Sequence, residues 1–501
     1  MASLKKAALW TTALALLLKL SGFIRESVIA KQFGISAETD GYNLAFGFIT
    51  LVVAMIATGF NNVFLPMYVK RRTEGAGDSN ANALLNWTMI LFAMISVVGW
   101  IFAEAFVPFI YGNMSAEVEV IAVNITQIFF AFMTMIALSG LLESYLQSRR
   151  IFVPSQLAKL LATLFSALFA LFFSDIWGIY AVANGFVFGT VVGALIQTFY
   201  LIRSDYHWRP DTKMESDFRK AFIVLIIPSL LNSVVGQVNL FVNRYFASGI
   251  GDGPVTILSY SSLITSIPTA IYGTTLAAII FTLMSEQVDK LDEFKGTFFR
   301  GMELSFVTLL PIAVGLGIVG DAVIEFIYER GAFTATDTQL VYVALLLYLP
   351  IIVFQGMQLM LSKSMYARGK TAVVFRISVT TIVVNYIMNW LFVDDFGYPA
   401  LALSASVVSI YYFTVSMIVV YKDLGMSEFK RFMRMSGRVV VPAIAMGLVV
   451  WGAKVLAGAS TWYPLVELAV LVPLGMIVYA VVLKVAYPVG FNRLLRMVKR
   501  G

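Results

Sequence analysis

Fourteen apolar segments recur along this chain, each long enough to cross a lipid bilayer. A membrane-spanning helix needs about 20 mostly apolar residues, and inside lipid a single segment satisfies its own backbone hydrogen bonds only as a helix. We therefore predict an all-α polytopic membrane protein, and a charged fraction of only 13% agrees. The predicted spans are 7–30, 42–66, 83–110, 120–146, 152–173, 177–202, 219–245, 256–284, 303–320, 337–362, 371–393, 398–421, 439–457 and 462–484.

The charged residues between these segments predict how the chain crosses the membrane. Most of the 36 Lys and Arg residues fall in alternate loops, whereas the other loops carry acids such as Glu117, Asp252 and Asp394. Basic loops stay on the cytoplasmic side of a membrane. This pattern fits an even number of spans with both termini in the cytoplasm; fourteen spans are predicted, and twelve is the alternative.

The polar segment from Arg203 to Lys220 divides the chain into two similar parts. VIAKQFG before the second span resembles FVNRYFASG before the eighth, and two equivalent halves are a common design of transporters. We predict two pseudo-symmetric six-helix lobes joined by a linker, followed by two further helices and a basic tail. The predicted divisions are 1–202, 203–218, 219–421 and 422–501.

The first span contains ionisable residues at unusual depth. Lys19 lies about 18 Å along a helix that begins near Ala7, and Arg25 and Glu26 follow. Each charge within a membrane costs about 2.5–3.5 kcal/mol on insertion scales. This helix therefore faces a polar cavity, or its cations form a buried structural ion pair with Glu26 or Asp40.

Several classes of chemistry find no support in the residues. The chain has no cysteine and one histidine, His207, so it lacks the usual ligands of a zinc site. It also lacks a phosphate-binding loop for ATP. We predict a protein that is not an enzyme and has no cofactor. A membrane glycosyltransferase or ligase is the alternative of a different class, and it would depend on Asp394 and Asp395.

Four stretches carry a family resemblance. They are KLSGFIRESVIAKQFGISAETDGYNLAF from Lys19, YERGAFTATDTQ from Tyr328, SMYARGKTAVVFRISVTTIVVNYIMN from Ser364 and GYPALALSAS from Gly397. The chain resembles the MurJ (MviN) lipid II flippases of the multidrug/oligosaccharidyl-lipid/polysaccharide exporter superfamily. The resemblance implies a flippase of the bacterial cytoplasmic membrane that serves peptidoglycan synthesis. It would carry undecaprenyl-diphosphate-linked lipid II to the outer leaflet by alternating access through a central cationic cavity.

The resemblance also implies site residues and partners. The partner is lipid II or a similar polyisoprenyl-diphosphate lipid, with membrane lipid around a monomer and no nucleic acid. Some family members hold sodium near acidic residues where this chain has amides, so at most a weak sodium site is expected, at Asn243, Asn385 and Asn389. The residues expected to bind substrate are Lys19, which stands where the family usually has Arg, with Arg25, Glu26 and Asp40. Apart from the resemblance, Arg244, near the outer end of the seventh span, either completes the cationic cavity as a further substrate-binding residue or extends to the membrane surface.

Two departures from the family keep other cargoes open. Val53 stands where the family often has an arginine, and Ser262-Leu263 stand where it has an Asp-Arg pair. A less basic cavity leaves a flippase for another lipid-linked oligosaccharide, of capsule or teichoic type, as the first alternative. A cation-coupled drug exporter of the same superfamily is the second, and the last two spans and the motif match disfavour it.

Substitution of Lys19 tests the importance of positive charge in the first span. We expect Lys19→Arg to retain activity, because relatives carry arginine there, and Lys19→Glu to abolish it, because the charge is reversed. The measurement is growth of a bacterium depleted of its own lipid II flippase. Equal rescue by both variants, at equal membrane abundance, would contradict the assignment.

Overall fold

The computed structural model describes residues 2–73, 78–204 and 206–498, without the side chains of 2–13, 15–16, 58, 72–73, 232–233, 236, 271–279, 494 and 496–498. Lys499 and Arg500 of the predicted basic tail lie outside this description. Every regular element within the described residues is a helix, and none is a strand. The predicted class, an all-α polytopic membrane protein, is confirmed.

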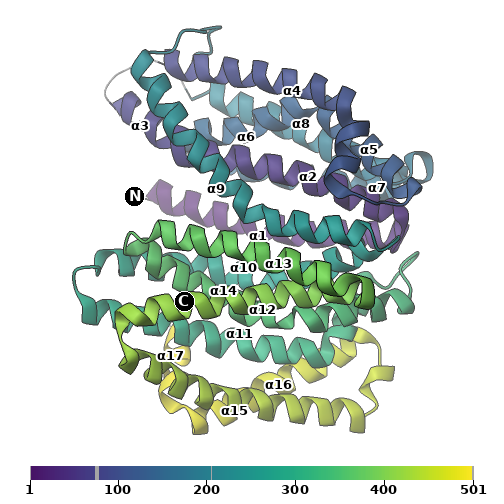
Figure 1. Cartoon of the computed structure of the whole chain (residues 1–501), viewed down its shortest axis with the longest axis vertical. Coiled ribbons are helices and arrows are strands. Elements are labelled where there is room, and N and C mark those ends of the chain that lie inside the picture. Colours follow the sequence, from purple (N-terminus) through teal and green to yellow (C-terminus); the bar gives the residue numbers. More distant parts are fainter. Residues whose placement is uncertain (1, 74–77, 205, 499–501) are drawn as a thin grey trace. The chain divides into compact units, whose positions relative to one another are not determined.

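Each predicted span has a helical counterpart in the same order (Figure 1). Among the described residues, ten helices are long and apolar enough to cross a membrane, and α5 and α6, bent by 56° at their break, meet the same criteria as a pair. The predicted first, seventh and eighth spans correspond to the long helices α1, α9 and α10, which include undescribed side chains, and the count of fourteen spans stays a prediction. The elements are α1 (Ala2–Phe33), α2 (Ala37–Gly59), the π-helical turn η1 (Phe60–Phe64), α3 (Leu65–Thr73), α4 (Ser79–Tyr111), α5 (Ala116–Ala131), α6 (Met133–Ser148), α7 (Val153–Trp177), α8 (Tyr180–Ile202), α9 (Ser216–Ser248), α10 (Pro254–Glu286), α11 (Leu291–Tyr328), α12 (Ala335–Ala367), α13 (Thr371–Phe396), α14 (Tyr398–Leu424), α15 (Met426–Leu456), the short 3₁₀ helix η2 (Ala459–Thr461), α16 (Pro464–Ala486) and α17 (Pro488–Val498).

The chain forms two compact units. The first comprises the residues up to Thr256 together with Arg330–Phe333, and the second comprises Ile257–Glu329 and the chain from Thr334 onward. Helix α9, which the prediction places in the second lobe, packs against α2 and α4. The predicted lobes are two similar halves of the sequence, whereas the two compact units are defined by packing. The structure therefore does not test the lobe boundaries, which stay a prediction.

The connection between α1 and α2 is fixed by its sequence. Gly34 ends α1 with a φ of +61°, a conformation that glycine adopts without the steric cost of a side chain. Ser36 then caps α2: its hydroxyl accepts a bond from the Thr39 amide, and the Thr39 hydroxyl accepts one from the Ser36 amide. This capping box sets the register in which α2 follows α1.

Small residues bring α7 and α8 into close contact in the first unit. Gly185, Gly189 and Gly193 recur every four residues along one face of α8. A Cβ on any of them would overlap atoms of α7, including the Phe165 and Leu161 carbonyl oxygens. Small residues at this spacing allow membrane helices to pack backbone to backbone, so the sequence itself specifies this pairing.

Residues 206–215, here called the strap, follow α8 and lie against the beginning of α4. Asn82 donates to the His207 carbonyl at 3.1 Å, and Asn86 donates to the carbonyls of Arg209 and Asp211 at 3.0 and 2.9 Å. These side chains bind the backbone of the strap, which has no regular secondary structure of its own. The segment predicted as a linker is thus bonded along its length to the first unit.

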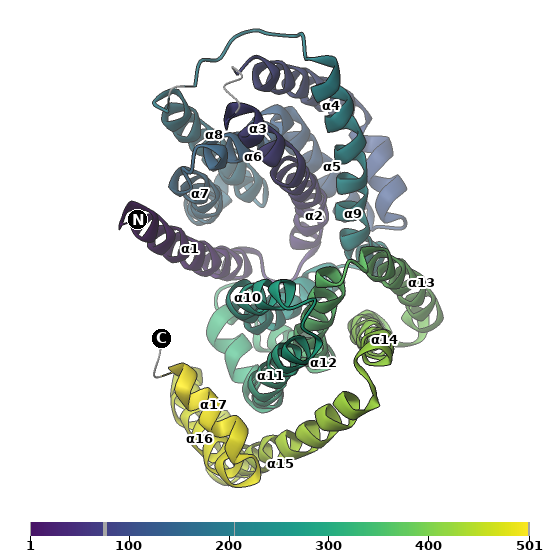
Figure 2. The ribbon, with the colours of Figure 1, turned by 90° about the vertical axis from the view of Figure 1, so that its left-hand side faces the viewer.

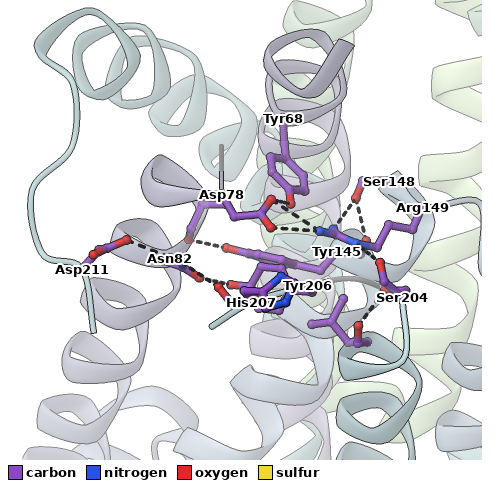
Figure 3. A network of polar contacts seen from close by, with 12 residues as sticks. Tyr68, Asp78, Asn82, Tyr145, Ser148, Arg149, Ser204, Tyr206, His207 and Asp211 are labelled. Atoms are coloured by element: carbon purple, nitrogen blue, oxygen red, sulfur yellow. Dashed lines mark hydrogen bonds and ion pairs between the residues drawn. The ribbon is translucent and has the colours of Figure 1, made fainter. Parts of the chain in front are cut away.

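A buried arginine anchors the first residue of the strap (Figure 3). The side chain of Arg149, 3% exposed, lies 3.4 Å from Asp78, and its guanidinium stands over the rings of Tyr68 and Tyr206. The Tyr206 hydroxyl donates to Asn82, and burial raises the pKa of that phenol, so it remains a neutral donor. A carboxylate and two aromatic faces together compensate the buried cation.

The second unit is organised around α11, which contacts α12, α15 and α16. Lys454 of α15 lies 2.6 Å from Asp321 of α11 and 2.9 Å from Glu467 of α16. At another level of α11, the buried carboxylate of Glu303 accepts bonds from Tyr487 and from Arg493 of α17. These ion pairs join the last helices, seen together in Figure 2, to α11.

The strap predicts a local stability effect. Asn86→Ala removes two bonds to the strap backbone and the acceptor of the Trp208 indole N–H. A loss of about 1–2 kcal/mol should raise the population of the released strap about 5–30-fold. Trypsin cleavage after Lys213 of the purified protein should accelerate by a similar factor. Asn124→Ala, on α5, is the control, and unchanged cleavage of the Asn86 variant would contradict this role.

Candidate functional site

The cations predicted in the first span occupy different surroundings in the first unit. Lys19 is exposed on α1. Arg25 and Glu26 are mostly buried, with 12% of each side chain exposed, and they form an ion pair in which Arg25 Nε lies 3.1 Å from Glu26 Oε1. The structure therefore contains the Arg25–Glu26 pair that the sequence offered as one reading of these charges, while Lys19 stays open to its environment.

An aromatic ring of α2 supports the arginine of this pair. The Arg25 guanidinium carbon lies 4.4 Å from the centre of the Phe46 ring. Such an interaction contributes about 0.5–2 kcal/mol, more when water is excluded. Phe46 also packs edge-on against Phe186 and tilted against Phe129, so its ring is held in place. Arg25 is thereby fixed against one side of α2.

Arg244 approaches α2 from α9. Its guanidinium lies against the backbone of α2 at Gly47, where a Cβ would overlap it. Within the part of the chain that the structure describes, Arg244 forms no ion pair with a carboxylate. This half-buried cation differs in that respect from Arg25, Arg149 and Lys454.

Phe46 and Gly47 are consecutive residues, so the two guanidinium groups contact neighbouring positions of α2. Successive residues of an α-helix point about 100° apart, and the two groups come from different neighbouring helices, α1 and α9. A planar guanidinium binds phosphate oxygens through two parallel hydrogen bonds. Two such groups at neighbouring positions of one helix are suited to a multivalent anion such as a diphosphate.

Asp40 of α2 binds the beginning of α10 and is buried there. It is 1% exposed, and its carboxylate accepts bonds from the Gly253 amide at 2.7 Å, the Thr256 amide at 2.8 Å and the Thr256 hydroxyl at 2.6 Å. An acid at the N-terminus of a helix satisfies its free amides and its dipole. Asp40 thus caps α10 from α2, and its predicted contact with substrate stays a prediction.

The amides predicted to hold sodium lie in two helices. Asn385 and Asn389 are one turn apart in α13 and buried, with exposed fractions of 1% and 0%. Asn243 lies beside Arg244 in α9, within the other compact unit. The arrangement within α13 agrees with the spacing in the sequence, and the sodium site stays a prediction.

Two residues of this site, Phe46 and Gly47, were missed by the sequence reasoning. An aromatic residue in an apolar span does not by itself indicate a cation partner. Gly47 did carry a signal, because a glycine inside a helical pattern costs about 1 kcal/mol relative to alanine. Only the structure shows which side chain fills the space beside it.

Two solved structures share this fold. An inward-facing multidrug resistance MATE family transporter of the MOP superfamily matches with a TM-score of 0.67 at 14% identity, covering 84% of this chain and 95% of that one. A lipid II flippase MurJ in an inward closed conformation matches with a TM-score of 0.81 at 20% identity, covering 95% and 98%.

The family follows from the sequence comparison. The family model described as lipid II flippase MurJ matches residues 29–472, and the chain belongs to this family. A lipid II flippase MurJ of Burkholderia cenocepacia is 25% identical over 422 residues, covering 81% of each chain. A probable lipid II flippase MurJ of Buchnera aphidicola subsp. Schizaphis graminum is 25% identical over 410 residues, covering 79% of each. The predicted resemblance is confirmed.

The capping of α10 predicts a stability effect at Asp40. Asp40→Ala leaves the Gly253 and Thr256 amides without their acceptor, and we expect a loss of about 1–3 kcal/mol in unfolding free energy. Asp40→Asn should lose less, because its amide oxygen still accepts. Thermal unfolding of the purified protein in detergent measures both. Glu117→Ala, an exposed acid of α5, is the control, and an Asp40→Ala protein as stable as the wild type would disprove the capping role.

Proposed function

We propose that this protein flips lipid II, the undecaprenyl-diphosphate-linked precursor of peptidoglycan, from the inner to the outer leaflet of the bacterial cytoplasmic membrane. Transport would proceed by alternating access through a central cationic cavity, without a catalysed reaction. Membership of the lipid II flippase MurJ family supports this function. The concentration of basic residues in alternate loops supports the orientation, with both termini in the cytoplasm.

The observation that carries the proposal is that two guanidinium groups, from α1 and α9, contact consecutive residues of α2. A diphosphate brings about two negative charges, and two unit charges 4 Å apart interact by about 4 kcal/mol at the effective dielectric constant typical of protein surfaces. Arg25 against Phe46 and Arg244 against Gly47 supply one cation each. Exposed Lys19 adds a third positive charge and lies six residues before Arg25 on α1.

Glu26 gives this site a means of release. In the absence of cargo, the Glu26 carboxylate compensates Arg25, so the cation is not left unpaired inside the membrane. A cargo phosphate would take the place of Glu26 on the guanidinium, and Glu26 would return when the cargo leaves. The exchange replaces one ion pair with another, which keeps the affinity moderate in both directions.

The remaining parts of the proposal concern ions and assembly. The protein would act as a monomer. Sodium would bind weakly at Asn243, Asn385 and Asn389, because amide oxygens ligate a hard cation but bring no negative charge. Absence of any sodium effect on transport would remove this part and leave the cargo assignment unchanged.

A flippase for another lipid-linked oligosaccharide is the second candidate. The family resemblance leads one to expect charged residues at positions 262 and 263. Ser262 is instead an exposed neutral residue of α10, and its hydroxyl donates to the Ser259 carbonyl at 3.0 Å. Rescue of a strain depleted of its own lipid II flippase separates the two candidates. Growth supports lipid II, and failure to grow despite good expression supports the other oligosaccharide.

Arg25→Ala tests the cargo site directly. We expect it to abolish rescue, because the diphosphate loses its bidentate partner and Glu26 becomes an unpaired acid. Rescue of growth and membrane abundance are measured together, so that loss of function is separated from loss of protein. Arg219→Ala, which removes one positive charge from an exposed position of α9, is the control. Full rescue by Arg25→Ala would remove this arginine from the cargo site.

A further inference from the structure

Gly47 lies within α2, far from either end of the helix. Glycine in a helix interior costs about 1 kcal/mol relative to alanine, and no turn or break of α2 occurs at this position. The neighbouring helix α9 packs against α2, as Figure 2 also shows. A Cβ added at Gly47 would overlap the Nη1 and Cζ atoms of Arg244. The absent side chain therefore leaves space for a guanidinium.

The direction of Arg244 explains how it reaches this space. Side chains of a helix lean toward its N-terminus, and Arg244 lies four residues before the end of α9. Its side chain therefore extends back along α9, away from the end of the helix, and its charged end comes to rest on α2. The preceding residue of α2, Phe46, has the Arg25 guanidinium over its ring.

We propose that Gly47 is a positioning residue, which holds the Arg244 guanidinium against α2 next to the residue that Arg25 contacts. The inference rests on the proposed function, because it gives Gly47 a role in binding the cargo diphosphate. The spacing of the two cations would decide whether both can engage one diphosphate. Any larger residue at position 47 would move the Arg244 charge away from α2 and alter that spacing.

A substitution at Gly47 can change the position of the Arg244 guanidinium without lowering the stability of the protein. The group that an alanine would displace is the far end of a flexible side chain, so α2 and α9 can keep their packing while the guanidinium moves. Alanine also favours the helix over glycine. Gly47→Ala should therefore leave the melting temperature unchanged or raise it, and still weaken cargo binding. A purely structural glycine would show the opposite combination.

The test is a double-mutant cycle on the full-length protein in detergent. Lipid II affinity and melting temperature are measured for Gly47→Ala, Arg244→Ala and the double variant. Gly315→Ala is the matched control, since that glycine lies in membrane helix α11 with open space beside it. We expect each single variant to bind lipid II about tenfold more weakly, as for one lost charge-assisted hydrogen bond. The double variant should bind no more weakly than Arg244→Ala alone, and the control should match the wild type.

Two outcomes would overturn the inference. One is wild-type affinity in Gly47→Ala, and the other is a double variant whose loss equals the product of the two single losses. If the wild type fails to bind lipid II, the proposed function fails, and a cryo-electron microscopy comparison of wild type and Gly47→Ala decides the inference separately. A guanidinium displaced from α2 in the variant supports it, and an unmoved guanidinium overturns it.

Discussion

A charge inside a membrane protein must be compensated by its neighbours, and this requirement organises both units of the structure. Arg149 lies between two aromatic faces and beside Asp78. Lys454 lies between Asp321 and Glu467. Removing one partner of such a buried pair typically costs 3–5 kcal/mol. The pairs are therefore expensive to break, and they fix which helices stay together.

Against this background the cations near α2 differ from the structural ones. Arg25 pairs with Glu26, its sequence neighbour on the same helix. Arg244 lies on the α2 backbone at Gly47. Positive charge whose compensation is local or incomplete is what an anionic lipid headgroup requires, and this is the physical content of the proposed cargo site.

The strap shows that a segment with the composition of a flexible linker can instead be bound to a neighbouring helix. The polar, proline-containing segment after α8 has the composition of a flexible linker. In the structure its backbone is bonded to Asn82 and Asn86 of α4, more than 120 residues earlier in the chain. The polar composition indicates that such a segment stays outside the membrane. It does not indicate whether distant side chains bind the backbone of the segment, because that depends on which helices lie beside it.

The sequence by itself determined the helical class, the order of the spans, the family and the residues that bring charge into the membrane. These follow from local properties: the length of apolar runs, the spacing of small residues on α8 and the motifs around Arg25. Tertiary structure alone decided what each charge does. Asp40 and Glu26 are both acids near the first span, yet one caps α10 and the other pairs with Arg25. The distinction arises because a carboxylate binds whichever donors lie within about 3 Å, and helices distant in sequence supply those donors.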